Sequence, residues 1–274
     1  MKKHYTIPFF IPFQGCPNKC IFCDQNRITG SAMPDAGSVP GKIEKYLATM
    51  PDSGVRREVG FFGGSFTGIS EKTQQLYLDA VRPFTRSGKI HGIRLSTRPD
   101  LIDPVTLERL SSSGVTRIEL GVQSMVDDVL RASGRGHTAA HTERASRLIL
   151  EQGLDLGHQI MLGLPESGPE QEMYTARRVS ECGADEVRIY PVIVIRGTAL
   201  ADMWMMNRYS PLSLDQALDR ASRMLLYFRS RSIRVIRCGL HPSEGLMSGE
   251  DYLAGPFHPS FGHKARVRAE GREL

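Results

Sequence analysis

Short apolar runs bounded by glycine and proline alternate along the chain with longer segments in which apolar residues recur at helical spacing. The longer segments predict helices around residues 42–50, 71–86, 104–113, 139–152 and 169–182. Asp103 followed by Pro104 is typical of an N-cap and the first helical position. The apolar runs predict strands near residues 4–13 and at 57–62, 92–96, 117–122, 154–162 and 186–194.

This alternation predicts an α/β fold in which helices cover a parallel sheet. Six strand–helix units in about 200 residues fit a partial (β/α)6 TIM-like barrel, and an open doubly wound sheet is the alternative. Beyond residue 200 the pattern changes to a connection over 202–213, a helix over 214–230 and a strand within 233–240. We therefore expect a core barrel over 1–200 and a short C-terminal α/β extension over 201–274, placed to cover a substrate.

The composition is that of an ordinary globular protein, with 40% hydrophobic residues, 24% charged residues and a net charge of +5. No apolar run approaches the about 20 residues that span a bilayer, so we expect no membrane segment. Lys2 and Lys3, the apolar stretch after them and Cys16 faintly resemble a lipoprotein signal with its lipid-accepting cysteine, but prolines interrupt the stretch. We expect a cytoplasmic protein, in which clustered cysteines bind metal more often than they form disulfides.

Three of the five cysteines lie within eight residues, directly after the first predicted strand. Cys16, Cys20 and Cys23 have the spacing C-x3-C-x2-C. Structural zinc takes four ligands, and ferredoxin-type clusters use four cysteines. Three thiolates without a fourth nearby instead suit a 4Fe–4S cluster with one iron left open. The alternatives are a zinc site completed from elsewhere in the chain and three incidental buried cysteines.

Glycine-rich or polar segments also follow the other predicted strands. They are "GGSFTG" at 63–68, "STRPD" at 96–100, "ELGVQS" at 119–124 and "LGLP" at 162–165. Ligands of parallel α/β folds bind at the carboxyl ends of the strands. The sequence therefore predicts one site at this edge, which the cysteine loop shares.

The cysteine spacing, with Phe22 before the third cysteine, resembles the radical S-adenosylmethionine (radical SAM) superfamily. "GGSFTG" resembles the superfamily's second motif, usually Gly-Gly-Glu. More closely, a series of motifs resembles the Elongator catalytic-subunit-like branch over roughly residues 5–200, and "LAGPFHPSFG" extends the match. The series is "PFFIPFQGCPNKCIFC", "FFGGSFTGI", "IRLSTRPDLID", "IELGVQSM", "RGHT", "GHQIMLGLP" and "RIYPVIVIRGTAL".

The resemblance implies that Cys16, Cys20 and Cys23 hold a 4Fe–4S cluster whose fourth iron binds S-adenosyl-L-methionine. An external electron donor such as flavodoxin or ferredoxin would reduce the cluster, and the cofactor would be cleaved to a 5′-deoxyadenosyl radical. Elongator-like relatives act on tRNA, so RNA is a candidate substrate. The roughly 75 residues after the core leave no room for an acetyl-CoA-binding domain, so carboxymethylation dependent on acetyl-CoA is not expected of this chain alone.

Residues in the same motifs are the implied contacts of S-adenosylmethionine. Gly63 and Gly64 would let the backbone approach the methionyl group, and Glu119 or Gln123 would bind the ribose. The alternative for Glu119 is a buried carboxylate paired with a structural arginine. The full set is Phe22, Gly63, Gly64, Ser65, Ser96, Arg98, Glu119, Gln123, Gln159, Leu162 and Leu164.

Basic residues recur in the last quarter of the chain, where they would neutralise phosphates or form a solvated surface. They leave a second function open, a non-catalytic RNA-binding module stabilised by a metal. The residues are Arg220, Arg223, Arg229, Arg231, Arg234, Arg237, Lys264, Arg266 and Arg268.

Overall fold

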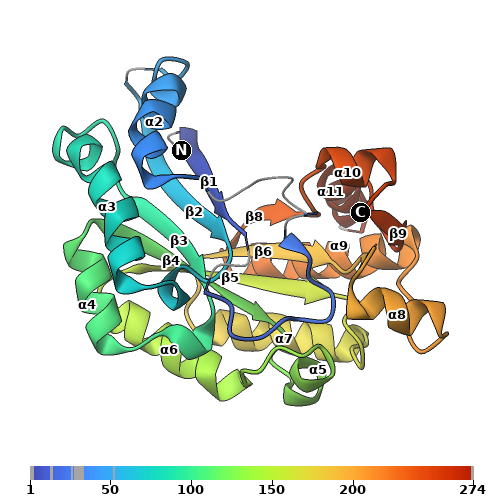
Figure 1. Cartoon of the computed structure of the whole chain (residues 1–274). Coiled ribbons are helices and arrows are strands. Elements are labelled where there is room, and N and C mark those ends of the chain that lie inside the picture. The colour runs from blue at the N-terminus through green and yellow to red at the C-terminus, as the bar shows by residue number, and fades with distance from the viewer. Residues whose placement is uncertain (1–2, 13–14, 26, 28–33, 52, 273–274) are drawn as a thin grey trace.

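A computed structural model describes residues 3–12, 15–25, 27, 34–51 and 53–272 of the chain. Seven parallel strands form one curled sheet in the order β1-β2-β3-β4-β5-β6-β8 (Figure 1). The order follows the chain without the reversal of a doubly wound sheet, so the prediction of a partial barrel is confirmed. The strands are β1 (Lys3–Ile11), β2 (Val55–Gly63), β3 (Ile93–Thr97), β4 (Val115–Gln123), β5 (Asp155–Leu162), β6 (Glu186–Pro191) and β8 (Arg234–Cys238).

Most of the helices lie along the convex side of the sheet (Figure 1). Asp103 caps α4 as predicted, since its side chain accepts a hydrogen bond from the Thr106 amide and Pro104 follows it. The helices are α2 (Val39–Leu47), α3 (Glu71–Arg86), α4 (Pro104–Ser112), α5 (Asp127–Ala132), α6 (Ala139–Glu151), α7 (Pro169–Glu181), α8 (Ala199–Met205), α9 (Leu214–Ser230), α10 (Glu244–Ser248) and α11 (Phe261–Glu270), with short 3-10 helices η1 (Ala36–Ser38), η2 (Phe66–Gly68) and η3 (Pro99–Leu101).

The two faces of the sheet differ in chemistry because side chains alternate along each strand. One face carries residues such as Phe9, Phe61 and Leu120, which are fully buried in the main hydrophobic core. The other face carries charged residues. Arg94 of β3 forms an ion pair with Glu186 of β6, although β4 and β5 separate their strands. Only the concave face of a curled sheet brings such distant strands together, so the charged residues line the inside of the half-barrel.

The structure corrects several predicted elements. The strand predicted over 186–194 ends at Pro191, and Val194–Ile195 forms a separate strand, β7, antiparallel to β9 (Tyr252–Ala254). α8 occupies part of the predicted connection and begins after the Thr198 cap. The helix α5 and the tail elements α10, β9 and α11 were not predicted. Position 13, the last of the first predicted strand, lies outside the described residues.

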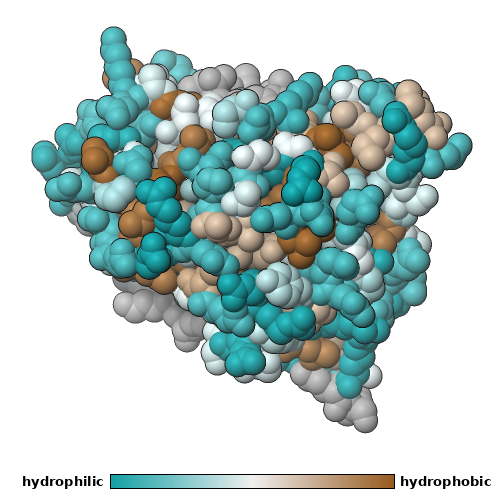
Figure 2. All heavy atoms as spheres, turned by 90° about the horizontal axis from the view of Figure 1, so that it is seen from below, coloured by the Kyte–Doolittle hydropathy of each residue, from teal (hydrophilic) through white to brown (hydrophobic). Residues whose placement is uncertain are grey.

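The C-terminal residues extend the sheet and cover its end. β8 pairs with β6, and α11 packs against α9 and β8. On the face shown in Figure 2, hydrophilic side chains predominate and hydrophobic ones are scattered among them. Within the part of the chain that the structure describes, no helix has the length and apolar character needed to cross a membrane.

Candidate active site

The cysteine loop is seated on the 63–68 loop by direct backbone contact. Gly15 adopts φ +73°, and a Cβ there would lie 2.1 Å from the Ser65 carbonyl oxygen. A Cβ on Gly68 would lie 2.0 Å from the Gly15 carbonyl oxygen. Only glycine permits both approaches, so these two residues fix the entry to the cysteine loop against the end of β2.

The opposite side of the cysteine loop rests on the segment after α5. The Ile21 amide donates to the Ser133 carbonyl oxygen at 3.2 Å. Gly136 adopts φ +73°, and a Cβ there would lie 2.0 Å from Nδ2 of Asn18. The Leu200 amide of α8 donates to the Ile21 carbonyl oxygen at 2.8 Å. Three separate parts of the chain therefore hold the loop in place.

The three predicted cluster ligands have different surroundings. Sγ of Cys16 lies 3.3 Å from Oγ of Ser65, and Cys20 is buried. Burial, followed by the charges of Cys20 and Cys16, raises the pKa of Cys23 to about 12. Three thiolates so close together require a compensating positive charge. The donor set fits an iron–sulfur cluster, because soft thiolate ligands bind iron–sulfur centres as they bind zinc and copper(I).

Among the described residues, no three His, Cys, Asp or Glu side chains gather as ligands of one metal ion. In a 4Fe–4S cube each thiolate binds a different iron, so the three sulfurs need not meet at one point. Cys238 is buried, Cys182 is half-buried at the end of α7, and all five cysteines are free of disulfides.

Arg135 connects the cysteine loop to the predicted site on β4. Its Nη1 donates to Sγ of Cys20 at 3.3 Å, and its Nη2 donates to the Gly121 carbonyl oxygen. Nη2 fills the space above Gly121, where a Cβ would come within 3.2 Å of it. The missing side chain of Gly121 leaves the room that this arginine occupies.

Arg98 is buried and holds the loop that carries Arg135. It donates two hydrogen bonds to Asp100, from Nε at 2.9 Å and from Nη2 at 3.0 Å, and Nη2 also donates to the Arg135 carbonyl oxygen at 2.5 Å. Arg98, implied by the resemblance to contact the cofactor, therefore has a carboxylate partner within the chain itself. Its Nη1 has no hydrogen-bond partner among the described residues.

Gly63 and Gly64 form the turn that ends β2. Gly63 adopts φ +104°, a region that favours glycine, and its carbonyl oxygen accepts from the side chain of Gln25. The Gly64 amide donates to the Ile11 carbonyl oxygen at 3.0 Å. Ser65 follows, 1% exposed and directed at Cys16.

Glu119 is buried in the charged layer of the concave face. Oε1 lies 2.9 Å from Nε of Arg94 and accepts from Nη2 of Arg188 at 3.1 Å, while Nε of Arg188 donates to Oε2. Burial would raise the pKa of Glu119, but the charges of Arg188 and Arg94 outweigh burial and lower it. Both carboxylate oxygens are thus engaged by arginines. This is the arrangement of the alternative hypothesis, a buried carboxylate paired with a structural arginine.

Uncharged polar side chains lie at the carboxyl ends of β3, β4 and β5. Nε2 of Gln159 donates to Oε1 of Gln123 at 3.3 Å. Gln123 adopts φ +67°, which is uncommon for a residue other than glycine and is often found at functional sites. Ser96 is half-buried near the end of β3, followed by Thr97, whose Oγ1 lies 2.6 Å from Oγ1 of Thr67.

Phe22 and Leu164 belong to a second hydrophobic cluster, which also contains Cys20 and Tyr209. Leu162 instead faces the main core. The structure therefore brings the cysteine loop and the loop after β5 together on one side of the predicted site.

Four residues of the predicted basic surface form ion pairs with carboxylates. Arg220 pairs with Glu172, Arg234 with Glu186, and Arg268 with Asp215. Arg223 likewise pairs with a neighbouring carboxylate. These pairs reduce the positive charge that the region offers to phosphates.

Sequence reasoning did not assign the charged inner layer. Arg94 and Arg188 were missed, although each occupies the inward position of its strand. Charged residues at every second position of a strand, as in "RIE" at 117–119, signal a polar face and would have identified the layer.

Comparison with known proteins identifies the family. The profile described as the Radical SAM superfamily matches residues 10–177, and that of the Radical_SAM C-terminal domain matches residues 184–273. A tRNA uridine(34) acetyltransferase of Dehalococcoides mccartyi is 30% identical over 91% of this chain and 70% of that protein. Elongator complex protein 3 of Danio rerio is 27% identical over 82% of this chain and 48% of that protein.

Among solved structures, the archaeal Elp3 of Methanocaldococcus infernus with an N-terminal deletion superposes with a TM-score of 0.75. The two sequences are 20% identical, and the match covers 100% of this chain and 64% of that chain. At this identity the likeness concerns the fold alone. On the family profiles and the Dehalococcoides relative, the chain belongs to the radical SAM superfamily, within its Elongator catalytic-subunit-like branch, and is an enzyme of that superfamily.

Proposed function

We propose that the chain holds a 4Fe–4S cluster on Cys16, Cys20 and Cys23 and uses it to cleave S-adenosyl-L-methionine reductively to a 5′-deoxyadenosyl radical. Membership of the superfamily implies both cofactors. The observation that carries the proposal is the seating of the cysteine loop. Gly15 and Gly68 lock it to the end of β2, and Ile21 bonds it to the segment after α5.

When bound, the cluster would supply the electron that cleaves the sulfonium, and the protein would bind, orient and exclude water. The turn at Gly63 and Gly64 lies beside Ser65, which is directed at Cys16, so this turn would face the methionyl group. Arg98 has a buried Nη1 without a partner among the described residues, and this group would meet the cofactor carboxylate.

The nucleoside would lie farther along the strand ends. Gln123 and Gln159 present amides to the ribose, with Ser96 nearby on β3. Phe22 and the backbone from Leu162 to Leu164 would surround the adenine. Since Glu119 is occupied by two arginines, we assign it to orienting the inner layer under the cofactor.

We propose tRNA as the substrate class, because the Dehalococcoides relative is a tRNA uridine(34) acetyltransferase. An external reductant such as flavodoxin or ferredoxin would deliver the electron, which requires a reducing compartment such as the cytoplasm. The proposed core over 1–200 would carry this chemistry, and the extension over 201–274 would cover its substrate side.

Anaerobic reconstitution tests the proposal. Wild-type protein with iron, sulfide, dithionite and S-adenosylmethionine should yield 5′-deoxyadenosine, measured by liquid chromatography with mass spectrometry. Cys20→Ala should lose cluster iron, whereas Cys182→Ala, a cysteine outside the loop, should retain iron near the wild-type level. Equal iron loss in the two variants, or a reconstituted wild type that forms no 5′-deoxyadenosine, would contradict the proposal.

A further inference from the structure

The loop after β5 is held by hydrogen bonds to both peptide groups of Gly163. The Gly163 amide donates to Oε1 of Glu172 at 2.8 Å, and its carbonyl oxygen accepts from the hydroxyl of Tyr209 at 2.6 Å. Gly163 lies between Leu162 and Leu164 and adopts φ +79°. Gly163, Glu172 and Tyr209 are all buried. The conformation of this loop is therefore set by residues distant in sequence.

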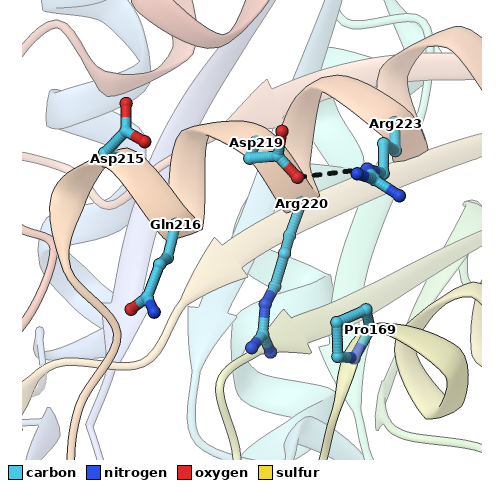
Figure 3. A pocket seen from close by; sticks show the side chains of 6 residues that line it. All are labelled: Pro169, Asp215, Gln216, Asp219, Arg220 and Arg223. Atoms are coloured by element: carbon cyan, nitrogen blue, oxygen red, sulfur yellow. Dashed lines mark hydrogen bonds and ion pairs between the residues drawn. The ribbon is translucent and has the colours of Figure 1, made fainter.

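The carboxylate on this glycine is itself fixed by α9. Nη1 of Arg220 donates to Oε1 of Glu172 at 2.9 Å. Glu172 is 2% exposed and Arg220 is 17% exposed at the side chain. Figure 3 shows Arg220 extending from α9 past Pro169 at the start of α7, while Arg223 turns to Asp219. Because a buried carboxylate requires a partner, the position of Glu172 depends on Arg220.

Packing adds a third contact from the same region of the chain. A Cβ on Gly163 would lie 3.0 Å from Cδ1 of Leu212, so this leucine sits directly on the glycine. Tyr209, whose hydroxyl is bonded to Gly163, has its ring in the hydrophobic cluster that contains Phe22 and Leu164. The contacts from 209, 212 and 220 converge on one peptide unit, and all three residues lie in the segment between β6 and β8.

We propose that Tyr209 and the Arg220–Glu172 pair are positioning residues that hold the Gly163 peptide so that the loop after β5 can read the adenine of S-adenosylmethionine. The inference rests on the proposed function, because that function places adenine at this loop. Its new content is that the C-terminal extension sets nucleoside affinity and base selectivity without touching the cofactor.

The first test measures hydrogen exchange in the intact, reconstituted protein. Arg220→Gln removes the partner of Glu172, and Arg223→Gln is the matched control on the same helix, since Arg223 pairs with a surface aspartate. Exchange in peptides covering residues 160–166 should be at least about ten-fold faster in Arg220→Gln and unchanged in Arg223→Gln. Equal exchange rates at residues 160–166 in the two variants would overturn the proposed dependence of this loop on Arg220.

The second test measures binding of S-adenosylhomocysteine and of its inosine analogue to protein of equal iron content. Tyr209→Phe removes one hydroxyl and keeps the ring, and Tyr227→Phe on α9 is the matched control. Tyr209→Phe should weaken S-adenosylhomocysteine about ten-fold and reduce the preference for adenine over hypoxanthine. If the Tyr209 hydroxyl only stabilises the fold, its removal will lower thermal stability and leave the preference for adenine unchanged.

The outcomes separate the two proposals. A reconstituted wild type that does not bind S-adenosylhomocysteine would overturn the proposed function and the positioning role together. Wild-type affinity and base preference in Tyr209→Phe, with normal binding by the wild type, would overturn the positioning role alone. Faster exchange at 160–166 together with reduced base preference would support it.

Discussion

Glu119→Gln tests whether the charged inner layer supports the barrel or binds the cofactor. Glu119 is 4% exposed and faces Arg94, also 4% exposed, and Arg188. The substitution keeps the shape and removes the negative charge. Arg94 retains Glu186, but Arg188 loses its carboxylate partner. Removing one partner of a buried ion pair costs about 3–5 kcal/mol, and a similar value follows for charges about 4 Å apart at an effective dielectric constant of about 20.

For a domain of this size, each kcal/mol lowers the melting temperature by about 2–4 °C, so we expect a fall of about 6–20 °C. Differential scanning calorimetry of anaerobic protein with equal iron content measures it. Glu143→Gln is the control, because Glu143 pairs with Arg178 at the surface, where an ion pair contributes about 1 kcal/mol or less. If Glu119 binds the ribose instead, the variant will melt within about 2 °C of the wild type and lose affinity for S-adenosylmethionine. That result would refute the assignment to the inner layer.

Two further perturbations address other parts of the molecule. Burial lowers the pKa of His158 to about 3, so between pH 6.5 and 3 the unfolded chain binds a proton that the folded chain does not. The His158 contribution to the free energy of unfolding should therefore fall by about 1.4 kcal/mol for each pH unit below 6.5. The stability of His158→Asn should fall less steeply than that of the wild type between pH 7 and pH 5, as measured by urea titration. Arg135 donates to Sγ of Cys20, and hydrogen bonds to cluster sulfurs raise the reduction potential. Arg135→Gln should lower the cluster midpoint potential by about 60 mV, a ten-fold change for one electron, as measured by electron paramagnetic resonance titration. Arg131→Gln, at an exposed position, should leave the midpoint potential unchanged. Equal potentials in the two variants would contradict the role of Arg135 in setting the cluster potential.

The barrel could be predicted because its signals are local. Each βα unit pairs an apolar run with an amphipathic helix, and the helix predicted over 71–86 has the observed bounds of α3. Beyond Pro191 the helix predicted over 214–230 also has the observed bounds of α9, and β8 lies within the strand predicted at 233–240, but the short elements there could not be predicted in the same way. β7 has two residues and exists because Tyr252–Ala254 returns to pair with it. Such a strand depends on a partner distant in sequence, and no local pattern encodes that partner.

The candidate site was predictable where motifs bear the chemistry. The cysteine spacing and the glycine turn of 63–68 lie side by side in the structure as strand-end reasoning expected. The partners of the charged residues were not predictable. Nothing in the sequence near Glu119 distinguishes a ribose ligand from the counter-charge of Arg94 and Arg188, because both arginines come from other strands. Pairing across a curled sheet becomes visible only when the register is known.

The concave face is divided into layers, and the division indicates which residues are available to a ligand. Toward the middle of the strands, Glu119 and its arginines compensate one another, which leaves little net charge to attract a substrate. At the carboxyl ends, the side-chain amides of Gln123 and Gln159 bond to each other in a weak 3.3 Å contact. A neutral amide that gives up such a contact for a ribose hydroxyl loses little, whereas Glu119 would leave buried arginines without a partner. The layering therefore favours Gln123 over Glu119 as the ribose contact.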